Sequence, residues 1–147
     1  MAHLTLEESF RKFNAKKWHN QMCWSAIAEN SISVITLWNH QILRDKEKRM
    51  MFYTCFEDDH VYWQGHAGNT KRKEHILNSQ ENHKGYFSAI EVFARDSDAR
   101  PIEIRKQVPM MKLWWKITQY NPETGEFSAE CDVSLLREEG ELYPSFL

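Results

Sequence analysis

Two β-type segments follow each other almost directly near the start of the chain. Residues 21–28 read QMCWSAIA and residues 31–38 read SISVITLW, with only Glu29 and Asn30 between them. Asn tolerates the positive φ that a tight turn requires, so the pair is typical of a β-hairpin. The edges of such a sheet must be paired or covered, and this requirement limits the folds open to the rest of the chain.

Five later segments have the composition of strands. The sequence NPETG joins the last two, and its Pro122 and Gly125 are typical of a hairpin loop. The final segment alternates, with Phe127, Ala129, Cys131 and Val133 on one face and Ser128, Glu130 and Asp132 on the other. The five segments are residues 50–56, 86–94, 101–108, 112–120 and 126–133.

Two helices complete the pattern. Thr5 and Glu8 have the spacing of a capping box, and Leu6, Phe10 and Phe13 recur at helical intervals, which predicts a first helix with an apolar face. A second helix is predicted from about residue 70 through KRKEHILNSQEN. Its predicted C-terminal cap is the glycine of the following HKG.

These elements predict one α+β domain over residues 1–147, with an acidic C-terminal segment at about 134–147. We expect a mostly antiparallel, curled or closed β-barrel of six to seven strands, of the PUA-like kind, with the two helices packed at its openings. Residues 44–49, RDKEKR, are predicted to form a charged loop.

Composition narrows the class of protein. The net charge is −2, but residues 121–147 hold seven acids and one base, so the remainder of the chain is mildly basic. The sequence has no apolar run of membrane-spanning length and no signal peptide at its start, which indicates a cytoplasmic protein. The three cysteines lie far apart without a C-x-x-C motif, so they are predicted to be small apolar strand residues.

The sharpest local feature is a cluster of cations at the predicted start of the second helix. With Thr70 or Asn69 as the cap, Lys71, Arg72 and Lys73 fill the first turn, where free backbone amides and cations together suit a phosphate. Alternatively, these cations form a solvated basic turn. The predicted nucleic-acid-binding residues are these three cations with three more around residues 100–106: Arg100, Arg105 and Lys106.

The second feature is an excess of aromatic residues, with six Trp in the chain. The consecutive Trp114 and Trp115 must face opposite sides of a strand. Exposed rings beside cations suit base stacking, and several rings together can enclose a flipped base; the alternative is that the rings fill the core. The predicted aromatic pocket consists of Trp24, Trp38, Tyr62 and Trp63.

Three stretches resemble a family of small bacterial and phage domains. The stretches are MCWSAIAENSISVITLW, GNTKRKEHI and NPETGEFSAE, which match its W-S-A…L-T-L-W, G-N-x-K-R and T-G-x-F motifs. The resemblance implies association with HNH-type restriction nucleases and, by analogy with PUA and SRA modules, a modified-base reader of phage defence. The positions that match its motifs are Trp24, Ser25, Trp38, Lys71 and Arg72.

Signals for catalysis are weak. Asp58, Asp59, His60 and His66 offer carboxylate and imidazole ligands for a metal, but their spacing matches no strong motif. No nucleophile motif or Gly-rich phosphate loop is present, so we predict no catalytic residue and no cofactor. The first hypothesis is therefore a non-catalytic nucleic-acid reader, with DNA favoured over RNA and a nuclease or host protein as partner.

Two other hypotheses stay open. Excess Trp and Tyr also suit the hot spots of a protein interface, so the chain can be a protein-binding module such as a phage-encoded inhibitor of a host enzyme. The third hypothesis is a small enzyme that uses a metal held by the loop at residues 58–66.

Overall fold

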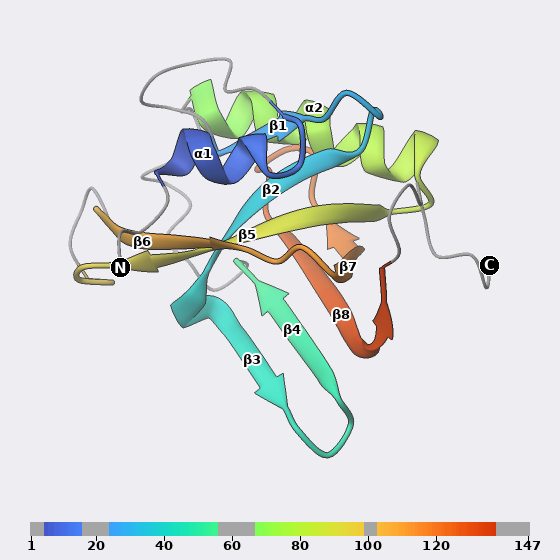
Figure 1. The fold of residues 1–147 in the computed structure, drawn as a ribbon. Coiled ribbons are helices and arrows are strands. Elements are labelled where there is room, and N and C mark those ends of the chain that lie inside the picture. Colours follow the sequence, from blue (N-terminus) through green and yellow to red (C-terminus); the bar gives the residue numbers. More distant parts are fainter. Residues whose placement is uncertain (1–4, 16–23, 56–66, 99–102, 138–147) are drawn as a thin grey trace.

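A computed structural model describes residues 5–15, 24–55, 67–98 and 103–137 of the chain. A short 3-10 turn, η1 (Asn39–Gln41), lies between the second and third strands. The helices and strands are arranged as Figure 1 shows: α1 (Leu6–Arg11), β1 (Ser25–Ile27), β2 (Ser33–Trp38), β3 (Ile42–Asp45), β4 (Met50–Thr54), α2 (Ala67–Asn82), β5 (Tyr86–Ala94), β6 (Ile104–Pro109), β7 (Leu113–Tyr120) and β8 (Phe127–Leu136).

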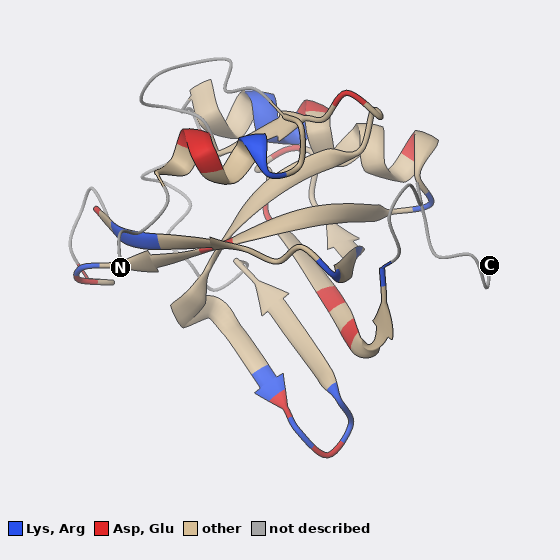
Figure 2. Cartoon of the chain, in the orientation of Figure 1, with Lys and Arg blue, Asp and Glu red and all other residues tan. Residues whose placement is uncertain are grey.

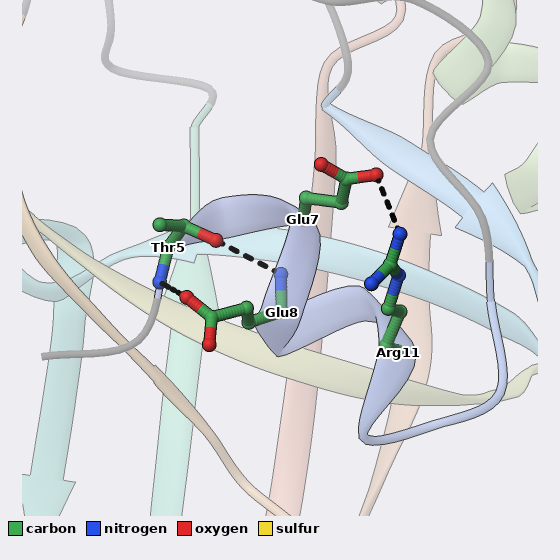
Figure 3. A network of polar contacts seen from close by, with 4 residues as sticks. All are labelled: Thr5, Glu7, Glu8 and Arg11. Carbon is green, nitrogen blue, oxygen red and sulfur yellow. Dashed lines mark hydrogen bonds and ion pairs between the residues drawn. The ribbon is translucent and has the colours of Figure 1, made fainter.

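Helix α1 begins with the predicted capping box. The Thr5 hydroxyl accepts a hydrogen bond from the Glu8 amide at 3.1 Å, and the Glu8 carboxylate accepts one from the Thr5 amide at 3.0 Å (Figure 3). Glu7 and Arg11 add an ion pair one turn apart. These local bonds satisfy amides that the first turn of a helix otherwise leaves unpaired, which explains how so short a helix is defined.

The strands form one mixed sheet in the order β1-β2-β5-β7-β8-β4-β3, and β6 pairs with the remaining free stretch of β5. Strands β1 and β2 form the predicted antiparallel hairpin, although the turn residue with positive φ is Ser31 rather than Asn30. Strands β2 and β5 are parallel, and every other pair is antiparallel. The α+β, mostly antiparallel class is therefore confirmed.

The predicted closed barrel is wrong. In the described part of the chain the sheet has eight strands rather than six or seven, and its end strands β1 and β3 are not paired with each other. Strand β1 has only three residues, and β3 belongs to a hairpin that projects away from the body (Figure 1). The predicted charged loop at 44–49 is the end of this β3–β4 hairpin, with Arg44 and Asp45 still in β3.

Two apolar clusters lie on opposite faces of β2 and β5. Phe10 and Phe13 from the α1 region pack with Val34, Ile90 and Val92 on one face. The larger cluster on the other face is centred on Trp115, Phe87 and Phe127 and receives Ile76 from α2. Each fully buried phenylalanine contributes roughly 1.5–3 kcal/mol. The two clusters fix the position of both helices on the sheet.

A buried acid ties the projecting hairpin to the central strand. Glu91 of β5 is buried, and its carboxylate accepts hydrogen bonds from the Asn39 side-chain amide at 2.6 Å and from the Arg44 guanidinium at 2.8 Å. The Arg44 side chain is 44% exposed, so solvent screens this ion pair, and losing it costs less than losing a fully buried pair. The Arg44 side chain therefore links strand β3 of the hairpin to strand β5.

Candidate functional site

Helix α2 starts earlier than the sequence predicts. It includes Ala67, so Lys71, Arg72 and Lys73 lie beyond the first turn, and Asn69 and Thr70 are helical residues rather than caps. The Lys71 ammonium pairs with Glu74 at 3.3 Å, and the Lys73 ammonium donates to the Glu123 carbonyl at 3.0 Å. The predicted placement of these three cations in the first turn of the helix is therefore wrong, and their binding of nucleic acid stays a prediction.

Arg72 is a buried residue, only 6% exposed. Its guanidinium carbon lies 5.0 Å from the Trp24 ring centroid and 5.2 Å from that of Phe127, and one of its nitrogens donates to the Asn69 side-chain oxygen at 3.3 Å. A guanidinium held between two rings stabilises the packing of both. Arg72 thus packs inside the junction between α2, Trp24 and β8.

The three sequence motifs meet around this arginine. The Asn69 side-chain amide donates to the Thr124 carbonyl at 2.9 Å, which joins the start of α2 to the β7–β8 turn. His75 Nδ1 and the buried Ser25 hydroxyl are 2.6 Å apart, which joins α2 to β1. Burial lowers the pKa of His75 to about 4, so its imidazole is neutral near pH 7. These three stretches therefore build a buried junction.

The predicted aromatic pocket is not formed by its described members. Trp24 stacks on Arg72, whereas Trp38 packs beside the α1 cluster, 5.7 Å from the ring of His40. Tyr62 and Trp63 lie outside the described residues, as do the metal candidates Asp58, Asp59, His60 and His66.

The strand cations lie apart from α2. Helix α2 packs on β1, β2, β5 and β7, whereas β6 packs on β5 and α1. A bulge between Phe93 and Ala94 brings two consecutive cations to one ring, with Arg105 at 5.7 Å and Lys106 at 4.5 Å from the Phe93 centroid. Arg100 lies outside the described residues.

A pocket of about 180 Å³ lies on the face of β5, β7, β8 and β4 that is turned away from the larger core. Its polar residues occupy facing positions of adjacent strands. In the strand register Lys116 lies opposite both Tyr86 and Glu130, and Met50 lies opposite Asp132. The sequence signal is the alternation of β7 and β8, which puts Trp114 with Lys116 and Glu130 with Asp132. The lining residues are Met50, Tyr86, Trp114, Lys116, Glu130, Asp132 and Leu135.

Two aromatic rings form walls of this pocket. Tyr86 and Trp114 meet edge to face, with centroids 6.1 Å apart and planes at 78°. The Lys116 ammonium lies 5.5 Å from the Tyr86 centroid, and the Arg137 guanidinium lies 4.2 Å from that of Trp114. Burial and then the Glu130 charge raise the pKa of Tyr86, so its hydroxyl stays protonated. The pocket combines two largely buried aromatic rings with hydrogen-bonding groups of both kinds.

The pocket lies beside the basic end of the β3–β4 hairpin. Met50 lines the pocket and directly follows Arg49, whose carbonyl accepts a hydrogen bond from the Val133 amide at 3.0 Å. Basic and acidic residues alternate around the hairpin end (Figure 2), and the exposed Lys46, Lys48 and Arg49 make no ion pair within the described residues. We call Lys46, Lys48 and Arg49 the hairpin tip.

Comparison of the chain with protein-family models, with curated proteins and with solved structures found no match. Neither of the two helices in the described ranges combines the length and the hydropathy that crossing a bilayer requires.

Proposed function

We propose that this protein is a non-catalytic nucleic-acid recognition module that binds through the Tyr86–Trp114 pocket and the hairpin tip. The observation that carries the proposal is their adjacency, because Met50 lines the pocket and Arg49, the next residue back, belongs to the tip. A base needs a flat apolar surface, and its phosphate needs a cation a few ångströms away.

The chemistry of each part fits this role. Base stacking on an aromatic ring contributes roughly 1–3 kcal/mol per base and does not depend on a particular base. The tip cations are exposed, so they can exchange their counterions for phosphates without breaking an internal ion pair. A projecting two-stranded ribbon also has dimensions that enter a nucleic-acid groove. The Arg105, Lys106 and Phe93 cluster offers a second place for backbone contact.

The test is a comparison of two double variants with the same change in charge. Binding of fluorescein-labelled single-stranded and duplex oligonucleotides is measured by anisotropy from 50 to 300 mM salt. Lys46→Glu with Lys48→Glu is expected to weaken binding at least tenfold and to reduce the salt slope by roughly 1.5–2, the loss of about two phosphate contacts. Lys71→Glu with Lys73→Glu, on α2, is the matched control and is expected to bind nearly as the parent does.

The outcome separates the two surfaces. A parent that binds no oligonucleotide at tens of micromolar in 50 mM salt would refute the proposal. Binding that is lost in the α2 variant and kept in the hairpin variant would move the interface to the helix.

A second candidate is a protein-binding module, favoured by exposed apolar side chains next to the same pocket. Leu136 is 65% exposed and continues β8 beyond Leu135, which lines the pocket, and Met111 is exposed in the β6–β7 turn. Such a rim around aromatic residues is typical of a protein interface. This alternative predicts no affinity for oligonucleotides at any of the salt concentrations, so the anisotropy titration separates the two candidates.

A further inference from the structure

The acceptors of the pocket are two carboxylates, those of Glu130 and Asp132. Glu130 makes no hydrogen bond or ion pair within the described residues, although it lines a partly closed pocket. Asp132 uses one carboxylate oxygen to accept from the amide and hydroxyl of Ser134. A carboxylate that lies in a pocket with no partner is a strong acceptor for a ligand N–H group.

Besides the Tyr86 hydroxyl, two nitrogen donors belong to residues that line the pocket. Lys116 is the cross-strand neighbour of both Tyr86 and Glu130, and its ammonium forms no ion pair with Glu130 or Asp132. The indole N–H of Trp114, a residue only 4% exposed, has no hydrogen-bond partner within the described residues. That nitrogen is itself shielded from solvent, so Lys116 is the donor on which the inference relies.

We propose that the pocket takes a base with an exocyclic amino group, namely cytosine, adenine or guanine, in preference to thymine or uracil. This inference rests on the proposed function. An amino-bearing base offers two or three N–H donors on its hydrogen-bonding edge, which Glu130 and Asp132 accept. Its ring nitrogen or carbonyl accepts from Lys116. Thymine and uracil offer only the single imide N–H, and their two carbonyls would face a pocket rich in carboxylates.

The wall geometry supports a single base rather than a run of bases. The Tyr86 and Trp114 rings meet nearly at right angles, so a ring stacked on one of them meets the edge of the other. Across the strands from Tyr86 the next two positions carry Lys116 and Glu130, and the next aromatic ring, Phe52, lies beyond Glu130 on β4. The preference is therefore expected at one position of a bound strand.

The experiment uses thymidine 12-mers that carry one central C, A, G or T. Their affinities for the full-length chain are measured by anisotropy at fixed salt. The three amino-bearing bases are expected to bind at least about fivefold more tightly than thymine, the effect of one well-made edge contact. Glu130→Gln offers a donor as well as an acceptor, so it is expected to bring the four affinities within twofold of each other. Glu123→Gln, in the β7–β8 turn, changes the charge equally and is expected to keep the preference.

Each outcome has one meaning. Equal affinity for all four bases in the parent would overturn the inference, and so would a preference that Glu130→Gln leaves intact. In both cases binding that still depends on Lys46 and Lys48 would leave the proposed function standing. Absence of binding to any 12-mer would instead remove the proposed function. Thermal unfolding of Glu130→Gln within a few degrees of the parent establishes that the variant is folded.

Discussion

The Arg72 guanidinium lies against the ring of Trp24, 5.0 Å from its centroid, although one residue is on α2 and the other immediately precedes β1. Phe127, the first residue of β8, covers the same guanidinium at 5.2 Å. This one side chain therefore joins a helix and two strands that are distant in the chain. The motif GNTKR is then explained by packing, because its arginine is a buried structural residue.

Replacing Arg72 is therefore predicted to destabilise the fold. Arg72→Ala removes the contacts with two rings and the hydrogen bond to the Asn69 side-chain oxygen, so we expect a loss of about 2–4 kcal/mol in the free energy of unfolding. Lys71→Ala, one residue earlier and partly exposed, is expected to change it by less than about 0.5 kcal/mol. Urea unfolding followed by fluorescence measures both. Equal stability of the two variants would contradict the structural role of Arg72.

Gly125 is the second structural point of the same junction. A Cβ at this position would lie 2.2 Å from the Asn69 side-chain oxygen, and the backbone φ is +88°. Gly85 has a similar φ of +86°, but its added Cβ would meet nothing closer than 3.6 Å. Gly85→Ala is therefore expected to cost only the backbone strain, about 1–2 kcal/mol. Gly125→Ala is expected to cost at least about 1 kcal/mol more, because Asn69 must also move. Chemical denaturation of the two variants tests the difference, and equal losses would mean that Asn69 moves freely.

Local sequence signals predicted much of the fold. Four predicted features are present, and each is encoded by residues that lie close together in the chain. They are the capping box of α1, the β1–β2 hairpin, the alternation of β8 and the NPETG turn. Gly85 also has the positive φ expected after α2. Strand β3 was missed because Arg44 and Asp45 are charged, and the ion pair of Arg44 with Glu91 lies across the sheet, beyond any local pattern.

The candidate site was harder to predict because its residues come from four strands. Tyr86, Lys116 and Glu130 become neighbours only through the register of β5, β7 and β8, which the sequence does not contain. The burial of Arg72 was missed for a related reason. Arginine is normally exposed, and the rings that cover this one lie in two other segments. Patterns in one strand identify a face, but the long-range pairing decides which faces meet.

The buried cysteines are predicted to be unreactive in the folded protein. Cys131 is 1% exposed, and burial raises the pKa of its thiol to about 12, so almost no thiolate forms near pH 8. Cys55 is also buried, with its sulfur between the amide and the carbonyl of Phe127. In a Cys23→Ser background, a thiol-specific chromogenic reagent is expected to modify no cysteine in native buffer and two in denaturant. Rapid modification of Cys131 in native buffer would contradict its assigned burial.

The free energy of unfolding is predicted to fall as the pH drops from about 6.5 to about 4, and the titration of His75 is one cause. Burial lowers the pKa of His75 in the folded protein to about 4, against an ordinary value of 6.5. Between these two values the unfolded chain binds the proton and the folded protein does not, so protonation favours unfolding. The full contribution of His75 to the free energy of unfolding is about 3 kcal/mol. It is present above pH 6.5 and is lost by pH 4.

His75→Gln removes this titration while keeping a polar side chain beside Ser25. The measurement is the free energy of unfolding from urea titrations at pH 4–7.5 for the parent and the variant. Carboxylates that titrate in the same window act on both proteins, so the difference between the two curves isolates His75. We expect the variant to be the less stable protein at pH 7.5 and the gap to narrow toward pH 4. Parallel curves would mean that the imidazole is solvated and that the α2–β1 junction opens readily.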